Sequence, residues 1–270
     1  MFAYHIVVST ILEFAVDLAF EAGRIQKDRY RERHSIFHKG EINIVTDVDL
    51  ACQERLMALI ARRFPGDGII SEEKENALEG GGNRWIIDPI DGTTNYAHGY
   101  PFFCVSVAYE IAGSIVCGVV YNPVFDELFF AEAGKGSYLN GRRLEVSPTG
   151  ILKQSLLVTG FPYDVATSSM NNIDHFVSFL HEAQAVRRDG SAALNLSYVA
   201  AGRFEGFWEL KLSPWDTAAG VLILTEAGGV VTDFAGRPFS IYGGQIVASN
   251  GRVHEAMLRV LKEGRKGARR

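Results

Sequence analysis

The predicted secondary structure changes near residue 150, and this change constrains the fold more than any other feature. Before it, short apolar runs are separated by turns such as Ala112-Gly113, which is typical of hairpins. Two amphipathic helices precede this sheet. Thr10 and Glu13 form a capping-box pattern that predicts Thr10 as the cap of the first helix, and the second begins near Thr46. The strands predicted in this half are 69–70, 85–87, 102–109, 114–121, 127–131 and 136–139.

Beyond residue 150, predicted strands alternate with predicted helices. The strands are 155–159, 184–187, 204–210, 230–233 and 245–249, and the helices are 170–182, 190–201, 216–227 and 252–263. An α+β half, residues 1–149, therefore precedes an α/β half, residues 150–270. The sequence shows no internal repeat or low-complexity segment, which excludes repeat architectures.

Composition indicates an ordinary globular chain. Its 270 residues are 47% hydrophobic and 22% charged, with a net charge of −5. That balance gives no general attraction for nucleic acid or anionic lipid. Glu13 and Asp17 interrupt the N-terminal apolar run, so we expect no signal peptide, no membrane segment and a cytoplasmic location. The three cysteines fit small buried hydrophobes, and the basic tail fits a frayed end; the residues are Cys52, Cys104, Cys117, Arg265, Lys266, Arg269 and Arg270.

The densest chemical signal lies between Trp85 and Asn95. A buried strand ends in two carboxylates, Asp88 and Asp91, followed by Gly92. Two close carboxylates ionise cheaply only around a cation, and hard oxygen ligands favour Mg²⁺ over zinc. The N–H groups after Asp91, if they open a helix, suit a phosphate. Taken alone, Asp-x-x-Asp-Gly is more often a turn with a helix cap.

Other acidic residues strengthen the metal interpretation. Glu72 and Glu73 follow a second buried strand, and Asp216 begins an apolar helix, where it can also act as an N-cap. Asp47 and Asp49 lie at the start of another helix, where capping alone could explain them.

The spacing of the residues excludes other known motifs of phosphate chemistry. The acids are three residues apart, whereas aspartyl-phosphate phosphatases of the haloacid dehalogenase type need Asp-x-Asp. The segment 133–137 does not fit a Walker A loop, and neither Gly-x-Ser-x-Gly nor His-Glu-x-x-His occurs. Without a covalent nucleophile, an activated water is the simplest attacking group.

The chain resembles the inositol monophosphatase family of Mg²⁺-dependent, lithium-sensitive phosphatases. The resemblance rests on two long motifs, WIIDPIDGTTNYAHGYPFFCVSVA from Trp85 and WDTAAGVLILTEAGG from Trp215. NIVTDVD from Asn43 and ISEE from Ile70 precede them in the expected order. The resemblance implies a layered αβαβα sandwich of the inositol monophosphatase and fructose-1,6-bisphosphatase type, and a homodimer.

The resemblance also implies the metal ligands. Glu72, Asp88 and the Ile90 carbonyl would hold one Mg²⁺. Asp88, Asp91 and Asp216 would hold a second, and a weaker third ion would share a water with Glu72. Two metal ions about 4 Å apart can bind the attacking oxygen and the leaving oxygen of an in-line displacement.

The remaining implied roles concern water and substrate. Thr93, bonded to Asp49, would activate the attacking water together with Glu72. The Gly92 and Thr93 N–H groups would bind the phosphate. The implied substrate contacts are Asp91, Gly92, Thr93, Arg188, Ser191, Glu209 and Asp216. For Arg188 the alternatives are a surface ion pair, contact with a phosphate or contact with a partner subunit.

The sequence departs from the family pattern at two places. Ser71 replaces the usual glycine before the glutamates, and the segment Leu210–Pro214 varies the rim of the implied substrate site.

The resemblance leaves more than one function open. Hydrolysis of inositol monophosphates is the first expectation. Fructose-1,6-bisphosphatase or dual activity is the alternative, and a regulatory or binding protein with a residual site is the alternative from another class. Thr94 makes a nucleotide 3′-phosphatase unexpected, since that branch tends to carry lysine there.

Overall fold

The computed structural model describes residues 9–73 and 82–267, with side chains up to residue 263. A seven-stranded sheet occupies the first half of the chain, in the order β3-β4-β5-β6-β7-β8-β9. Strands β3 and β4 are parallel and the remaining neighbours are antiparallel. The strands are β3 Gly68–Ser71, β4 Asn83–Asp91, β5 Cys104–Ile111, β6 Ser114–Asn122, β7 Glu127–Glu132, β8 Ser137–Leu139 and β9 Arg142–Arg143.

A five-stranded sheet follows, in the order β11-β10-β12-β14-β13. β11, β10 and β12 are parallel, and β14 is antiparallel to both of its neighbours. The strands are β10 Leu156–Thr159, β11 Ala185–Arg187, β12 Gly206–Leu210, β13 Val230–Thr232 and β14 Gln245–Ser249.

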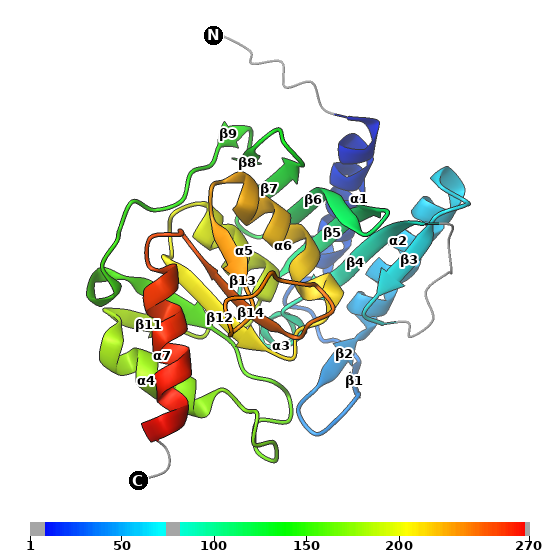
Figure 1. The fold of residues 1–270 in the computed structure, drawn as a ribbon. Coiled ribbons are helices and arrows are strands. Elements are labelled where there is room, and N and C mark those ends of the chain that lie inside the picture. The colour runs from blue at the N-terminus through cyan, green and yellow to red at the C-terminus, as the bar shows by residue number, and fades with distance from the viewer. Residues whose placement is uncertain (1–8, 74–81, 268–270) are drawn as a thin grey trace.

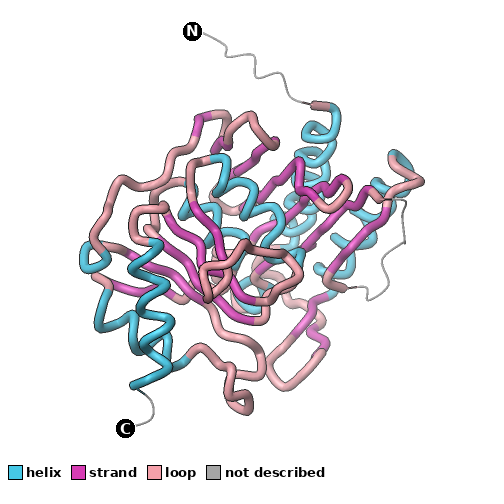
Figure 2. Tube along the Cα trace, viewed as in Figure 1, coloured by secondary structure: helices cyan, strands magenta, loops and turns pink. Residues whose placement is uncertain are grey.

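The helices complete five layers, which Figures 1 and 2 show from the same side. α1 and α2 cover one face of the large sheet, α5 and α6 lie between the sheets, and α4 and α7 cover the outer face of the small sheet. The expected αβαβα sandwich is thereby confirmed. The helices are α1 Thr10–Arg29, α2 Asp47–Arg63, α3 Thr93–Ala97, α4 Ile173–Glu182, α5 Ala192–Ala200, α6 Pro214–Glu226 and α7 His254–Gly267.

The middle layer explains why α6 is apolar on every side. A helix between two sheets exposes little of its surface to water, so it needs no polar stripe; in α6 the exposed residue is Thr225, in the last turn. The buried residues of α6 are Thr217, Ala218, Ala219, Gly220, Leu222, Ile223 and Leu224. Together with α5 they form the core shared by both sheets.

Several predicted boundaries were wrong. The side chain of Ser9, not of Thr10, caps α1, because it accepts the Leu12 N–H. The hairpin of β1 (Ile36–His38) and β2 (Ile44–Thr46) was not predicted, since the strands are short and β1 is wholly exposed. Strand β9 and the 3₁₀ turn Leu152–Gln154 were also missed.

Helix boundaries shifted where a capping residue decides them. Asn172, with φ of 72°, delays α4 to Ile173, and Ser191 caps α5, which begins at Ala192. α6 begins earlier than predicted, at Pro214, because Ser213 and Asp216 form a capping box. The side chains of the basic tail lie outside the described residues.

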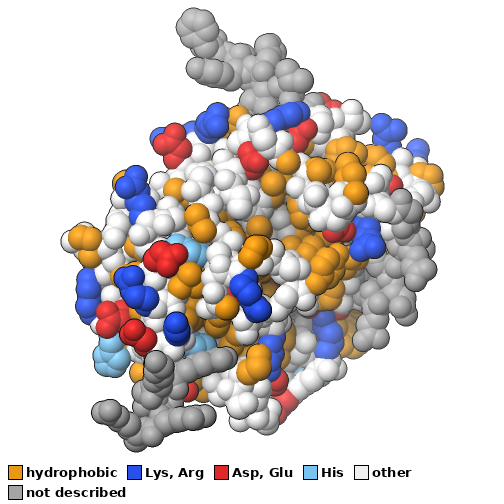
Figure 3. Space-filling model, in the orientation of Figure 1, with side chains coloured by type: hydrophobic (Ala, Val, Ile, Leu, Met, Phe, Trp, Pro, Cys, Tyr) orange, Lys and Arg blue, Asp and Glu red, His pale blue; other side chains and the backbone are white. Residues whose placement is uncertain are grey.

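The surface and the helices bear on the expectations about charge and membranes. On the face that Figure 3 shows, basic and acidic side chains are interspersed. Within residues 9–73 and 82–267, no helix has the length and hydropathy needed to cross a bilayer.

Close approach of α6 to the large sheet generates a prediction. A Cβ at Gly118 in β6 would lie 2.9 Å from the carbonyl oxygen of Ala219, so α6 would have to move. We expect Gly118→Ala to lower the free energy of unfolding by about 2 kcal/mol. Urea denaturation measures this loss. The matched control is Gly66→Ala, since a Cβ there meets nothing within 4 Å; equal stability of the two variants would contradict the packing argument.

Candidate active site

A bulge at the end of β4 brings Asp88 and Asp91 together. In a regular strand, residues three apart point to opposite faces. Here Asp88 pairs with Ser106 and Asp91 with Cys104, so β4 has one residue more than β5 between the two pairs. The extra residue turns the second carboxylate to the side of the first.

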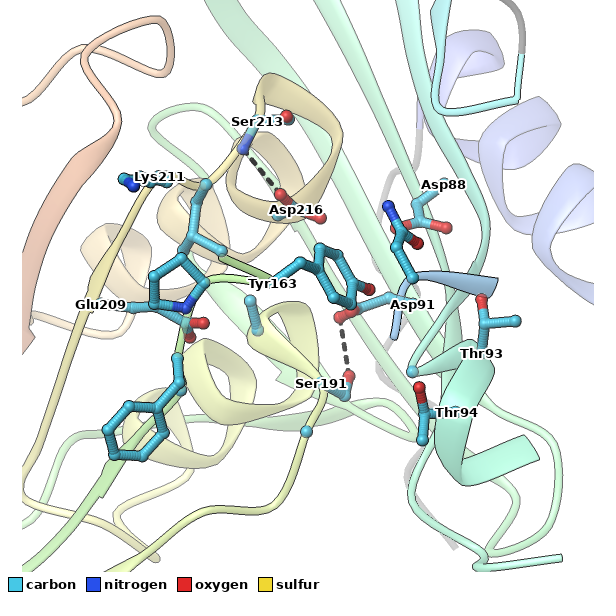
Figure 4. A pocket seen from close by; sticks show the side chains of 18 of the residues that line it. Asp88, Asp91, Thr93, Thr94, Tyr163, Ser191, Glu209, Lys211, Ser213 and Asp216 are labelled. Atoms are coloured by element: carbon cyan, nitrogen blue, oxygen red, sulfur yellow. Dashed lines mark hydrogen bonds between the residues drawn. The ribbon is translucent and has the colours of Figure 1, made fainter. Parts of the chain in front are cut away.

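Asp216 reaches the same place from the N-terminus of α6. Its Oδ2 accepts the Ser213 N–H at 2.7 Å as part of the capping box. Oxygens of Asp88, Asp91 and Asp216 all lie within 4.8 Å of one another. Figure 4 shows the three side chains arriving from the large sheet and from α6.

Crowding and burial raise the pKa of all three carboxyl groups. Burial contributes most, and the neighbouring acids add to it. The pKa of Asp91 rises to about 6, since bonds from the Ser191 hydroxyl and the Ala193 N–H, both at 2.7 Å, partly offset burial. Those of Asp88 and Asp216 rise further above their usual range. Such hard oxygen donors, unfavourable as bare anions, fit a divalent cation of the Mg²⁺ type.

Glu72 lies close to this cluster but is engaged by a lysine. Lys39 Nζ donates to Glu72 Oε1 at 3.0 Å and to Glu73 Oε1 at 2.7 Å. Burial, and then the charge of Glu72, raise the pKa of Glu73 to about 7. Lys39 begins the turn between β1 and β2, a hairpin that the sequence did not reveal, so this contact had no local signal.

Thr93 and Asp49 form a hydrogen-bonded pair beside the carboxylates. The Thr93 hydroxyl donates to Asp49 Oδ1 at 2.7 Å, and it lies 3.1 Å from the Ile90 carbonyl oxygen. The other oxygen of Asp49 accepts the Thr46 N–H at 2.9 Å in the capping box of α2. Asp49 thus caps a helix and also holds Thr93. Burial raises its pKa to about 6, against the lowering effect of these bonds.

Gly92 allows the backbone to turn tightly just before Thr93. Its φ of 102° favours glycine, and a Cβ there would lie 3.0 Å from the Phe102 carbonyl oxygen. Asn95 Nδ2 donates to the carbonyl oxygens of Phe102 and Asp189, each at 2.7 Å. Asn95, which the sequence analysis did not single out, therefore fixes the start of α3 to the segment before α5.

A cavity of about 410 Å³ opens over these groups. Ile90, Gly92, Arg188, Ser191 and Glu209 line it, as do the three clustered aspartates, Glu72 and Thr93. Asp49 is absent from the lining and is linked to the cavity by its hydrogen bond with Thr93. Figure 4 shows Tyr163 projecting between the Glu209 side and Asp91; no sequence pattern had drawn attention to it.

The predicted substrate contacts differ in what else they bind. The Ser191 hydroxyl accepts the Leu194 N–H and donates to Asp91, so its proton is already engaged. Glu209 packs so tightly against Gly160 that a Cβ there would lie 2.0 Å from its Oε1. Burial, and after it the charge of Asp91, raise the pKa of Glu209 to about 8, against the lowering effect of Arg188.

The raised pKa of Glu209 generates a prediction for the protein in EDTA. Protonation of Glu209 stabilises the folded protein. This contribution to the free energy of unfolding is complete below the ordinary pKa of 4.5 and is lost as pH rises through about 8. Between pH 6 and 8, we expect the wild type to lose about 2 kcal/mol more unfolding free energy than Glu209→Gln. Urea denaturation at both pH values measures this, with the exposed Glu182→Gln as control. Equal slopes for wild type and Glu209→Gln would contradict the assignment.

Comparison with known proteins agrees with this geometry. The model of the inositol monophosphatase family matches residues 7–266. The chain is 40% identical to an inositol-1-monophosphatase of Mesorhizobium japonicum, over 94% of this chain and 97% of the relative. It is 41% identical to the Nus factor SuhB of Escherichia coli, over 94% and 96%.

Solved structures give the same result. An inositol monophosphatase from Anabaena superposes with a TM-score of 0.86 at 42% identity, over 94% of this chain and 96% of the other. The extragenic suppressor protein suhB from Bartonella henselae gives 0.89 at 38% identity, over 95% and 100%. With three carboxylates around one point, a tight glycine turn beside them and relatives matched along nearly their whole length, the chain belongs to the inositol monophosphatase family and is a phosphatase.

Proposed function

We propose that the protein hydrolyses inositol monophosphates to inositol and phosphate with the help of Mg²⁺. The observation that carries the proposal is the meeting of Asp88, Asp91 and Asp216 within 4.8 Å, beside the turn at Gly92. Buried carboxylates with raised pKa values need a cation, and the N–H groups beyond Gly92 suit a phosphate. The names of the relatives supply the substrate class.

The metal ligands we propose are those implied by the sequence. Glu72, Asp88 and the Ile90 carbonyl would hold one ion, and Asp88, Asp91 and Asp216 a second, with a third ion near Glu72. Bound Mg²⁺ supplies Lewis acidity, which acidifies water and stabilises the charge of the leaving oxygen. For the first ion, Glu72 has to exchange its bond from Lys39, which is a half-buried contact at a hairpin turn.

Thr93, Asp49 and Glu72 would prepare the attacking water. Because the Thr93 hydroxyl donates to Asp49, its lone pairs face away and can accept a hydrogen bond from water. Asp49, with a pKa of about 6, can hold the proton that Thr93 relays. Glu72 lies on the cavity wall and can accept the second hydrogen bond of that water.

The substrate would lie between the Gly92 turn and Glu209. The Gly92 and Thr93 N–H groups would hold the phosphate, and Glu209 and Arg188 would bind hydroxyl groups of the polyol. Ser191 would act mainly by holding Asp91, since its proton is engaged there. A homodimer and a cytoplasmic location complete the proposal.

Phosphate release from a substrate panel tests the function. The panel is inositol 1-phosphate, fructose 1,6-bisphosphate, glycerol 2-phosphate, NADP and 3′-phosphoadenosine 5′-phosphate, each with Mg²⁺ and with EDTA. We expect release that depends on Mg²⁺ and is fastest with inositol 1-phosphate. Equal or faster release from fructose 1,6-bisphosphate would make the protein a dual-activity enzyme or a sugar bisphosphatase.

Asp91→Asn tests the metal assignment. The change removes a charged ligand of the second ion while keeping the size of the side chain, so we expect turnover to fall by about a thousandfold or more. Without metal the variant should be at least as stable as the wild type, because one buried like charge is gone. Steady-state kinetics and urea denaturation measure the two effects. Asp174→Asn, on the exposed side of α4, is the control; near-normal turnover of Asp91→Asn would refute the assignment.

Thr93→Ala tests the water-activating pair. It removes the hydroxyl but leaves the backbone N–H groups, so we expect kcat to fall about a hundredfold with a much smaller change in KM. Thr93→Ser keeps the hydroxyl and is expected to retain most of the rate. A loss confined to KM, or an equally inactive serine variant, would show that the hydroxyl does not act in the chemical step.

A regulatory or binding role is the second candidate, because relatives at 41% identity are named Nus factor SuhB. The Asp91→Asn variant separates the two functions. If it loses hydrolysis but restores the cellular phenotype of a deletion strain, the regulatory role is the main one.

A further inference from the structure

Lys211 stands in a backbone conformation that L-residues rarely adopt. Its φ is 60°, in the short segment between β12 and α6. Its N–H donates to the Gly244 carbonyl oxygen at 2.5 Å, which fixes the segment in this shape. Glycine would fit without strain, and strained residues that persist are concentrated at functional sites. The side chain of Lys211 is therefore the feature to explain.

The ammonium of Lys211 is held at the rim of the active-site cavity. Its Nζ donates to Asp164 Oδ2 at 2.5 Å and to Ser168 Oγ at 2.9 Å. Asp164 and Lys211 both line the cavity, from the segment after β10 and the segment after β12. About a third of the Lys211 side chain and half of the Asp164 side chain are exposed to solvent. Exposed ion pairs of this kind are weak, so another anion can replace Asp164.

Lys211 lies at the opposite end of the cavity from the phosphate-binding turn. Figure 4 shows Thr93 and Thr94 on one side of the cavity, and Lys211 and Glu209 on the other. Arg188 and Lys211 are the basic residues among those that line the cavity in the described chain. Arg188 already acts on Glu209, since its charge lowers the pKa of that carboxyl group.

We propose that Lys211 selects phosphate monoesters that carry a second anionic group remote from the phosphate being cleaved. When no such group is present, Asp164 holds the ammonium. When it is present, it takes the place of Asp164 on Lys211. The proposal rests on the proposed function, because it assumes that the phosphate to be cleaved lies at the Gly92 turn. A sugar bisphosphate and a phosphorylated sugar acid both offer this chemistry.

Two pairs of esters that differ chiefly in the second anion test the proposal. Fructose 1,6-bisphosphate is compared with fructose 1-phosphate, and 6-phosphogluconate with sorbitol 6-phosphate, which carries a hydroxymethyl group in place of the carboxylate. The measured quantity is a ratio within each pair: kcat/KM for the ester that carries the second anion, divided by kcat/KM for the ester that lacks it. A change in the first pair alone identifies a phosphate as the second anion, and a change in both pairs identifies any anion; either result supports the proposal.

Three variants separate charge from backbone shape. Lys211→Met removes the charge and keeps the chain length, and Lys211→Gly removes both the charge and the strain. We expect each to lower the ratio about fivefold. Asp164→Asn frees the ammonium and should raise the ratio about threefold. Urea denaturation should show Lys211→Gly to be at least as stable as Lys211→Met, so that unfolding does not account for the loss.

The two charge changes are expected to shift the kcat/KM ratio in opposite directions, which distinguishes anion binding from a structural role. If the ion pair only fastened the two rim segments together, Lys211→Met and Asp164→Asn would shift the ratio in the same direction. That result, or an unchanged ratio, would overturn the proposal while leaving hydrolysis of inositol 1-phosphate intact.

Binding measurements keep the test independent of the proposed function. Calorimetric titration with the same two pairs, in a Thr93→Ala background that slows turnover, gives dissociation constants for each rim variant. If inositol 1-phosphate is not hydrolysed, the proposed function fails. A fivefold weaker binding of the bisphosphate to Lys211→Met, with fructose 1-phosphate as reference, would still support the role of Lys211. Equal loss for both esters would overturn it.

Discussion

Electrostatic repulsion among buried carboxylates is the constraint around which this structure is arranged. Asp88, Asp91 and Asp216 bring their oxygens within 4.8 Å of one another at the junction of a sheet and a helix. Burial and mutual charge raise the pKa of each, which is unfavourable for the fold without a cation. The surrounding fold therefore carries an arrangement that a bound cation would stabilise, as expected of a site shaped for function rather than for stability.

Hydrogen bonds from the second half of the chain hold this arrangement in place. The Ser191 hydroxyl and the Ala193 N–H, both at the start of α5, donate to Asp91. Asn95 joins the turn after β4 to the Asp189 carbonyl. The aspartate cluster and the segment that begins α5 are thus joined by direct bonds, and a shift of α5 would move a carboxylate of the cluster.

The rim of the cavity follows a different principle from its floor. On the floor, buried groups are fixed by short bonds to backbone N–H groups and hydroxyls. At the rim, Lys211 pairs with Asp164 and Lys39 pairs with Glu72, through side chains that remain partly exposed; Lys39 also pairs with Glu73, whose side chain is buried. Exposed ion pairs exchange partners at little cost in free energy. The floor can therefore keep its geometry while the side chains at the rim change partners.

Local patterns in the sequence determined the residue types of the site and most of the elements that carry them. Apolar runs and their breaks predicted the two sheets and the long helices, because burial imposes periods of two and 3.6 residues on each element separately. The acids at 72, 88, 91 and 216 stood out because each follows a strand or begins a helix. The pairing of Thr93 with Asp49 came from the family resemblance and not from spacing.

Only the tertiary structure decided which side chains meet. The bulge in β4 depends on its pairing with β5, and the contacts of Lys39 with Glu72 and of Lys211 with Asp164 join segments 33 and 47 residues apart. Sequence periodicity carries no information about such distances, since they are set by how whole elements pack. The left-handed conformation of Lys211 was equally hidden, because its bond to Gly244 comes from a loop distant in sequence. The sequence by itself thus determined the chemistry available to this protein, and packing determined where each group acts.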